Sequence, residues 1–490
     1  MRSNPAAEPQ KANWWILSAL AFGTFMGTLD GSITNIALPV IARDLQLPNV
    51  ASASWVTLAY LLTSGSLFLL FGRLGEYVGT KRIYVIGLIV FTIASVLCGL
   101  APSYLPLVIF RVIQGVGSAM IIAVGPAILT TAFPSNQRGR ALGLNAAIVS
   151  AGLASGPTIG GFLLQYLDWR SIFWINLPIG LVGLIWAIRI LPVGERKPAR
   201  TFDVLGAALL AIGLLAILLA TTEGDSWGWR SVETIGSYAI GVLFFAAFIV
   251  RQLRLADPLL DLRLFRERPF SAGNSGTLFS FSALAVVTFL MPFFLVEAQG
   301  RSAQVAGLAL TVMPIGMAAA APLAGTLSDR FGARILGVAG MLLMTFGTIY
   351  LSTLDISAGL TSIVIGLFAC GAGNGMFQPP NTSLVMGSVR REKVGTASGM
   401  IASMRTLGFV FGIAIAGAVV AASRPGYIAQ FTMTASAELV PNLAFVASIH
   451  NALYVATGCT IAALILSLVR GQPPQAQASQ PARATATTTA

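Results

Sequence analysis

Long apolar segments alternate with short polar ones along the whole chain. Most apolar segments hold about 18–25 residues, the length that a helix needs to cross a hydrocarbon core of about 30 Å. Since lipid offers no hydrogen bonds to the backbone, these segments are predicted to be helices. The fourteen predicted spans are residues 14–38, 53–72, 82–101, 104–130, 140–164, 170–190, 203–222, 234–252, 270–296, 303–324, 332–353, 358–386, 396–422 and 446–469.

The composition and the two ends agree with a membrane protein. Of the 490 residues, 56% are hydrophobic and 10% are charged, against about 25% charged in a typical soluble domain. Residues 1–13 and 471–490 are polar and are predicted to be disordered. The first apolar segment is too long for a signal peptide and lacks a cleavage site, so it is expected to remain as the first helix.

The positive charge indicates topology rather than nucleic-acid binding. The net charge is +12, and of the 30 Lys and Arg residues 23 fall on the side of the N-terminus, five on the other side, and two, Arg111 and Arg405, within spans. Because Lys and Arg are enriched in cytoplasmic loops, both termini are predicted to be cytoplasmic. The expected partner of this surface is the lipid bilayer, and no nucleic acid is expected.

Residues suited to catalysis or metal binding are sparse. Cys98, Cys370 and Cys459 lie in apolar spans without metal or redox spacing, so packing is their expected role. The single histidine, His450, stands near the start of the last span. Without a His or Cys cluster or a nucleophile–base pair, we expect no enzyme activity and no metal site.

An internal repeat divides the chain into two halves. "GRLGEYVGTKR" (72–82) reappears as "GTLSDRFGAR" (325–334), and "RALGLNA" (140–146) as "TASGMIA" (396–402), at nearly equal separations. Parallel repeats of this kind place a substrate site at the membrane midplane between the halves. The predicted organisation is a six-helix half (14–190), an inserted two-helix segment (191–252), a cytoplasmic linker (253–269) and a second six-helix half (270–470).

Several motifs together resemble the fourteen-span drug:proton antiporters of the major facilitator superfamily, the multidrug exporter type. They are "LDGSITNIALPVIARDL" (29–45), the loop motif above, "RVIQGVGSAM" (111–120), the glycine-rich fifth span, "DWRSIFWINLPIG" (168–180) and "DPLLDLRLFRERPF" (257–270). The resemblance covers roughly residues 14–470. It implies an all-α polytopic membrane protein with the major facilitator fold, two six-helix halves plus two inserted central helices.

The resemblance also implies a function. It is export of amphipathic or cationic drugs across the bacterial inner membrane by alternating access, in exchange for protons and without a cofactor. The alternative is export of a lipid or another endogenous metabolite. The sequence does not say whether a periplasmic adaptor takes part.

The fifth span concentrates glycine and proline where a helix is expected. Gly152, Gly156 and Gly160 are spaced by four and form one smooth stripe along a helix, which permits close helix packing. Static packing is one interpretation, and a pliable seam between the halves is the other, which the resemblance favours. The residues that match the family's antiporter motif are Gly143, Gly152, Gly156, Pro157, Gly160 and Gly161.

Charged residues inside spans are candidates for proton coupling. Asp30 lies within the first span, where a carboxylate is costly, so we expect it to face a cavity. A structural acid bonded to a neighbouring helix is the alternative. The resemblance implies that Asp30 exchanges a proton for a cationic substrate. Arg111, with Gln114 one turn on, either lowers the proton affinity of Asp30 or ties helices through carbonyl groups.

Two further sets of residues complete the hypothesis. The loop repeats imply a cytoplasmic latch between states, although Glu76 replaces the usual Asp of the family in the first copy. Its residues are Gly72, Glu76, Gly79, Lys81, Arg82, Asp329 and Arg330. Soft Met and aromatic side chains suit an adaptable apolar pocket. The candidates are Phe25, Gln114, Met291, Phe294, Met313 and Phe377.

Overall fold

The computed structural model describes residues 14–133, 135–192, 203–255, 258, 261–389, 394–433 and 436–469. These residues contain no strand, and fourteen helices are long and apolar enough to cross a membrane. The helices are α1 Trp14–Asp44, α2 Val50–Val78, α3 Thr80–Gly99, α4 Tyr104–Ala132, α5 Ser135–Tyr166, α6 Ser171–Trp174, α7 Asn176–Ile190, α8 Val204–Trp227, α9 Val232–Arg254, η1 Leu262–Arg266, α10 Arg268–Phe293, η2 Phe294–Ala298, α11 Ala303–Phe331, α12 Ala333–Ser352, α13 Leu360–Gly387, α14 Val394–Thr432 and α15 Val440–Val469.

The predicted number of spans is confirmed, but several predicted ends are wrong; α2 and α11, for example, continue six and seven residues past their predicted ends. α1 continues to Asp44, six residues past the predicted end, with Pro39 inside the helix. α14 continues to Thr432, ten residues past its predicted end. A helix needs apolar residues only where it crosses the hydrocarbon, so hydropathy does not report where a helix ends in the polar region beyond.

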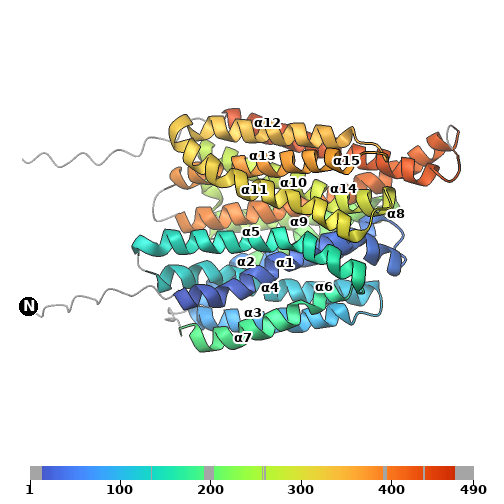
Figure 1. Ribbon diagram of the computed structural model, residues 1–490. Helices are drawn as coiled ribbons and strands as arrows, with labels where there is room; N and C mark the ends of the chain where they lie inside the picture. Colours follow the sequence, from blue (N-terminus) through green and yellow to red (C-terminus); the bar gives the residue numbers. More distant parts are fainter. Residues whose placement is uncertain are drawn as a thin grey trace, which may run out of the picture.

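The helices form two groups that lie side by side (Figure 1). α1–α7 make one group, and α10–α15 make the other. We call the side of the bundle where α1 begins and α15 ends the terminal side, and the opposite side the distal side. The two groups are called the N-half and the C-half below.

The two halves repeat one structural plan, as the loop motifs predict. α2 and α11 are separated by 253 residues at both ends, and so are α3 and α12. The turns that follow α2 and α11 both contain a glycine with positive φ, +107° at Gly79 and +85° at Gly332. The helix contacts repeat as well. A Cβ atom on Gly87 would lie 3.0 Å from the carbonyl of Gly117, and the equivalent pair is Gly340 and Gly373, at 2.6 Å.

α8 and α9 form a hairpin that bridges the halves. α8 packs against α2 of the N-half and α14 of the C-half. Asp203 caps the start of α8 by accepting a hydrogen bond from the Gly206 amide at 2.8 Å. The same carboxylate binds two side chains near the end of α9, Arg251 Nε at 2.6 Å and Gln252 Nε2 at 2.8 Å. This cluster holds the open end of the hairpin together.

Asp203→Asn is expected to destabilise the hairpin. Burial raises the pKa of Asp203, but its bonds to Arg251, Gly206 and Gln252 outweigh that effect and leave the pKa below the ordinary value. Loss of the charge is expected to lower the free energy of unfolding by about 2 kcal/mol, as for a hydrogen bond to a charged group. Thermal unfolding of the detergent-solubilised protein measures it, with the exposed Asp225→Asn on the same helix as the control.

The pH dependence of this effect follows from the direction of the pKa shift. A carboxyl group whose pKa is lower in the folded chain contributes its full stability above the unfolded value of about 3.9 and loses it as the pH falls further. The difference in melting temperature between the wild type and Asp203→Asn is therefore expected above about pH 4 and should shrink below it. An unchanged difference at pH 3 would contradict the assignment.

Candidate functional site

A cavity of about 250 Å³ lies between the two halves. α1, α2, α4 and α5 line it from the N-half, and α10, α11 and α14 from the C-half. None of its described lining side chains is Asp, Glu, Lys, Arg or His. The polar ones are Thr28, Ser32, Asn35, Thr57, Tyr60, Ser64, Ser118, Thr288 and Thr406; the large apolar ones are Ile36, Leu61, Ile122, Leu153, Phe281, Leu284, Leu310, Met313, Met317, Phe409 and Ile413.

The halves touch on the distal side of this cavity. The Thr158 hydroxyl of α5 and the Thr311 hydroxyl of α11 are hydrogen-bonded at 2.6 Å. A Cβ atom added to Gly161 would lie 2.7 Å from the Ala303 carbonyl oxygen, so glycine is needed there for the helices to approach. These contacts, one between side chains and one at the backbone, join the halves on the distal side.

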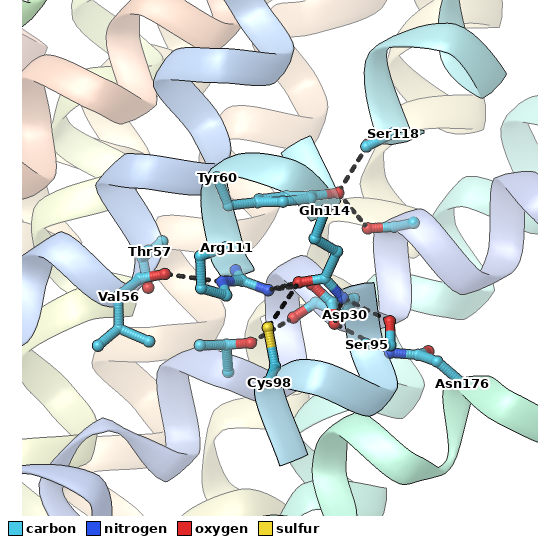
Figure 2. Close-up of polar contacts among 12 residues, drawn as sticks. Asp30, Val56, Thr57, Tyr60, Ser95, Cys98, Arg111, Gln114, Ser118 and Asn176 are labelled. Carbon is cyan, nitrogen blue, oxygen red and sulfur yellow. Dashed lines mark hydrogen bonds and ion pairs between the residues drawn. The ribbon is translucent and has the colours of Figure 1, made fainter. Parts of the chain in front are cut away.

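A buried network surrounds Asp30 inside the N-half (Figure 2). Arg111 Nη1 of α4 donates to Asp30 Oδ2 at 2.5 Å. Asp30 Oδ1 accepts from Gln114 Nε2 at 2.9 Å and from Asn176 Nδ2 of α7 at 3.0 Å. Ser95 of α3 accepts a second bond from the Gln114 amide, at 2.7 Å. Donors from α4 and α7 thus bind the carboxylate, α3 joins the network through Gln114, and the Asp30 and Arg111 side chains are both 0% exposed.

Tyr60 of α2 separates this network from the cavity. Its ring lies under the Arg111 guanidinium, whose central carbon is 4.4 Å from the ring centroid. Its hydroxyl donates to the Gly27 carbonyl at 3.2 Å and pairs with Ser118 at 2.8 Å. Tyr60 also lines the cavity, so its side chain contacts both the cavity and the buried cation.

Of the two roles that the sequence left open for Arg111, the structure shows the tie between helices, and an effect on the proton affinity of Asp30 stays a prediction. Arg111 pairs with Asp30, and its Nε donates to the Val56 carbonyl of α2 at 2.8 Å. Its Nη2 has no hydrogen-bond partner among the described residues. A guanidinium with a spare donor is ready to bind a second acceptor when its neighbours move.

The expectation that Asp30 faces a cavity is wrong for this structure. Gly27, Gly31 and Asn35 of α1 line the cavity, whereas Asp30 and Thr34 are turned into the N-half and are wholly buried. The physical reason is the partner. A carboxylate within reach of a buried guanidinium and two amides is better satisfied there than beside a wall without charge.

The glycine stripe of α5 packs inside the N-half rather than between the halves. Cβ atoms on Gly152, Gly156 and Gly160 would collide with α1, the first two with Thr28 and Ser32 respectively. The contact between the halves lies instead on an adjacent face of the helix, about 100° away, where Pro157 and Gly161 meet α11. Gly143 lies in α5, but its surroundings fall outside the described residues.

α14 repeats this arrangement in the C-half. Gly408 and Gly412, each 256 residues after a stripe glycine, pack against Leu278 and Ser282 of α10. Gly417, the counterpart of Gly161, approaches the other half, because its added Cβ would lie 3.1 Å from Cα of Ala51 in α2. The distal closure thus has two pseudo-symmetric contacts, α5 with α11 and α14 with α2.

Only one of the six predicted pocket residues lines the cavity. Met313 does. Gln114 belongs to the Asp30 network, and Met291, Phe294 and Phe377 are buried in the protein core. Phe25 is not among the lining residues, and its backbone carbonyl faces Gly152. Hydropathy cannot separate a residue on the cavity wall from a core residue, since both surroundings are apolar.

The predicted latch is only partly described. Lys81 Nζ donates to the carbonyls of Ile188 and Leu191 at the end of α7, within its own half, at 2.8 and 2.6 Å. Gly72 approaches Ala123 of α4, and Arg82 and Arg330 are exposed. The Glu76 and Asp329 side chains lie outside the described residues, so an interaction between them and the other half stays a prediction.

The sequence analysis missed three residues of the network. Asn176 and Ser95 bind the network directly, and Tyr60 covers it. Asn176 had a usable signal, because an amide in an apolar span must find a partner. Tyr60 and Ser95 had none, since tyrosine and serine are common in membrane helices for packing.

Comparison with known proteins now identifies the family. A model of the Major Facilitator Superfamily matches residues 20–250 and 274–489. Riboflavin transporter RibZ of Clostridioides difficile (strain 630) is 35% identical over 410 residues, which are 82% of this chain and 87% of that protein. Multidrug resistance protein Stp of Mycobacterium tuberculosis (strain CDC 1551 / Oshkosh) is 33% identical over 407 residues, 83% of this chain and 75% of that one.

The fold is also that of solved transporters. A bacterial homologue of the human lysosomal transporter Spinster, in an inward-facing and occupied conformation, superimposes with a TM-score of 0.64 at 19% identity, covering 96% of this chain and 97% of that one. The family match covers most of the chain, and the relatives are transporters. The chain therefore belongs to the major facilitator superfamily and is a membrane transporter, not an enzyme, with fourteen candidate spans among its described residues.

Proposed function

We propose that this transporter exports uncharged or amphipathic lipophilic molecules in exchange for protons, which needs the proton gradient and no cofactor. The observation that carries the proposal is the pairing of two features. A cavity without charged side chains among its described residues lies between the halves, and the ring of its wall residue Tyr60 packs against the guanidinium of the buried Asp30–Arg111 pair. The cavity provides a cargo site, and Asp30 provides a proton site.

The cavity wall favours lipophilic cargo over a simple cation. None of its described lining residues is a carboxylate, and two cations lie behind its aromatic rings: the Arg111 guanidinium carbon is 4.4 Å from the ring centroid of Tyr60, and that of Arg405 is 5.6 Å from the ring centroid of Phe281. A cationic drug would therefore be repelled unless Asp30 became exposed to it. One relative is named for riboflavin transport and another for multidrug resistance, so riboflavin and lipophilic drugs are the two cargo classes to test.

Coupling between cargo and proton would act through α1. One face of α1 lines the cavity, and another carries Asp30 into its network with α4 and α7. Protonation removes the negative charge from Asp30 and weakens its bond to Arg111, which frees α1 to shift. Because the same helix contacts the cargo, each ligand changes the free energy of binding the other.

The direction of export rests on the placement of charge. The terminal side carries most of the Lys and Arg residues, so we place it in the cytoplasm and the distal side in the periplasm of a bacterial inner membrane. The halves are in contact on the distal side, which this placement makes the periplasmic side. Cargo from the cytoplasm or from the inner leaflet would then fill the cavity before the halves rearrange.

The test uses purified protein in proteoliposomes with an internal pH dye. The panel contains a neutral lipophilic dye (N-phenyl-1-naphthylamine), a lipophilic cation (ethidium) and riboflavin. Addition of the neutral dye is expected to cause saturable proton movement opposite to the cargo. Cargo transport without proton movement would remove the coupling, and transport of ethidium alone would make the transporter a cation exporter.

A further inference from the structure

A second cavity, of about 330 Å³, lies beneath the inserted hairpin. α8, α9 and η1 line one side of it, and α2, α10 and α14 line the other. The wall is mainly apolar, with residues such as Leu210, Leu214, Phe245 and Phe248, and none of its described residues is charged. Its hydroxyl-bearing residues are Ser66, Ser275, Ser403 and Thr406. The hairpin thus encloses space against both halves instead of packing flat against them.

Ser66 is a polar residue in the wall of this cavity. Its side chain lines the cavity and is only 4% exposed. Its hydroxyl oxygen has no hydrogen-bond partner among the described residues, although the neighbouring Ser64 donates to the Leu61 carbonyl in its own helix. A buried hydroxyl without a partner is unfavourable. A ligand that brings a hydrogen-bond acceptor would relieve this cost.

The second cavity adjoins the central one. Leu61 and Thr406 line both. At the boundary α2 meets α14, and a Cβ atom on Gly65 would lie 2.6 Å from the methyl group of Thr406. Because α2 belongs to the N-half and α14 to the C-half, relative movement of the halves changes the width of this boundary.

The depth of the second cavity places it in one leaflet. Ser66 is nearer to the terminal end of α2 than to its distal end, and η1 lies beside the terminal start of α10. The cavity therefore lies toward the terminal ends of the spans, in the leaflet from which the proposed lipophilic cargo would enter.

We propose that the second cavity is a cargo-binding site that precedes the central cavity. It takes an uncharged lipophilic molecule with one hydrogen-bond acceptor, which receives a bond from Ser66, and passes it between α2 and α14 at Gly65 and Thr406. The inference rests on the proposed export of lipophilic cargo. It gives the inserted hairpin a function in binding, in addition to joining the halves.

Benzophenone is the probe for this site, because it is uncharged, has two aromatic rings and one carbonyl acceptor, and reacts with nearby C–H bonds under light. The full chain in lipid nanodiscs is irradiated with it, and the labelled peptides are found by mass spectrometry. We expect saturable labelling of the α14 peptide that contains Met404 and of the α8 peptide that contains Leu210.

Two variants and a matched control sharpen the test. Leu214→Trp fills the cavity from α8 and is expected to abolish the saturable labelling, whereas Leu215→Trp, at a position 40% exposed on the same helix, should leave it unchanged. Ser66→Ala removes only the hydroxyl, so the protein is expected to fold. The benzophenone concentration that gives half-maximal labelling is expected to rise about fivefold, as for the loss of one neutral hydrogen bond. Diphenylmethane, which lacks the carbonyl, should compete equally well in both proteins.

The labelling experiment in nanodiscs needs no proton gradient, so its result is independent of the result of the transport assay. Saturable labelling in a protein that exports none of the panel compounds would keep the site and remove the proposed export function. Labelling that does not saturate, or that is the same in Leu214→Trp, Leu215→Trp and the wild type, would overturn the site. Equal half-saturation in Ser66→Ala and the wild type would overturn the assigned hydrogen bond.

Discussion

Asp30→Asn is expected to abolish cargo-driven proton movement while cargo still binds. The cavity wall is formed by other residues of α1, such as Gly31 and Asn35, so its shape and polarity should change little. The amide cannot gain or lose a proton in the physiological range, so the proposed proton site is lost. Proteoliposomes with an internal pH dye measure the proton flux, and binding of the neutral dye is measured on the same protein.

Stability has to be separated from coupling, because the mutation leaves a buried cation. Removal of one partner of a buried ion pair costs about 3–5 kcal/mol. The double variant Asp30→Asn/Arg111→Gln removes both charges and is expected to regain much of that stability without regaining proton flux. Asp44→Asn, at the distal end of the same helix and 47% exposed, is the control for loss of an acid and should keep normal flux.

Wild-type proton flux in Asp30→Asn would refute the assignment. Glu297, at the distal end of the ninth span, would then be the next acid to examine. Loss of proton flux in the single variant with recovery in the double variant would mean that an unpaired Arg111, and not the missing proton site, blocks the cycle. The set of three variants therefore distinguishes a proton carrier from a structural ion pair.

The sequence was a good guide to architecture because the membrane imposes strong rules. Long apolar segments have to be helices, and the two copies of the loop motif place equivalent glycines with positive φ at Gly79 and Gly332. Asp30 and Arg111 were also identifiable, since a charge in an apolar span needs a partner. Both features depend on which residue type is present and not on the direction in which its side chain points from the helix.

The sequence did not reveal which neighbour each face of a helix contacts. In a soluble protein the polar face of a helix marks the solvent side, but lipid and neighbouring helices are equally apolar. The sequence therefore gave no sign that Asp30 turns away from the cavity, or that Gly156 faces α1 while Gly161 faces α11. The same ambiguity hid Tyr60, whose position between cavity and cation depends on the packing of three helices.

The two faces of α5 can be separated by experiment, because glycine stands on each. Gly161→Leu is expected to fold, since its side chain would enter the contact between the halves and leave each half intact. The added Cβ would lie 2.7 Å from the Ala303 carbonyl and 3.1 Å from Cα of Gln304, which is backbone that cannot rotate away. Gly156→Leu would instead collide with Ser32 and the Ile33 amide inside the N-half. Overpacking of this kind costs about 1–3 kcal/mol or more, so less folded protein is expected.

Gly161→Leu should therefore hold the distal side apart and stop export, with the yield of folded protein near that of the wild type. Spin labels at Leu167 and Ser357, exposed positions on the distal side of the N-half and the C-half, report the separation by pulsed electron paramagnetic resonance. We expect a longer distance in Gly161→Leu and no change in Gly458→Leu, whose added Cβ meets nothing within 4 Å.

Normal export by Gly161→Leu with an unchanged distance would show that the contact of α5 with α11 is tolerant packing. Normal folding of Gly156→Leu together with a longer distance would return the glycine stripe to the boundary between the halves.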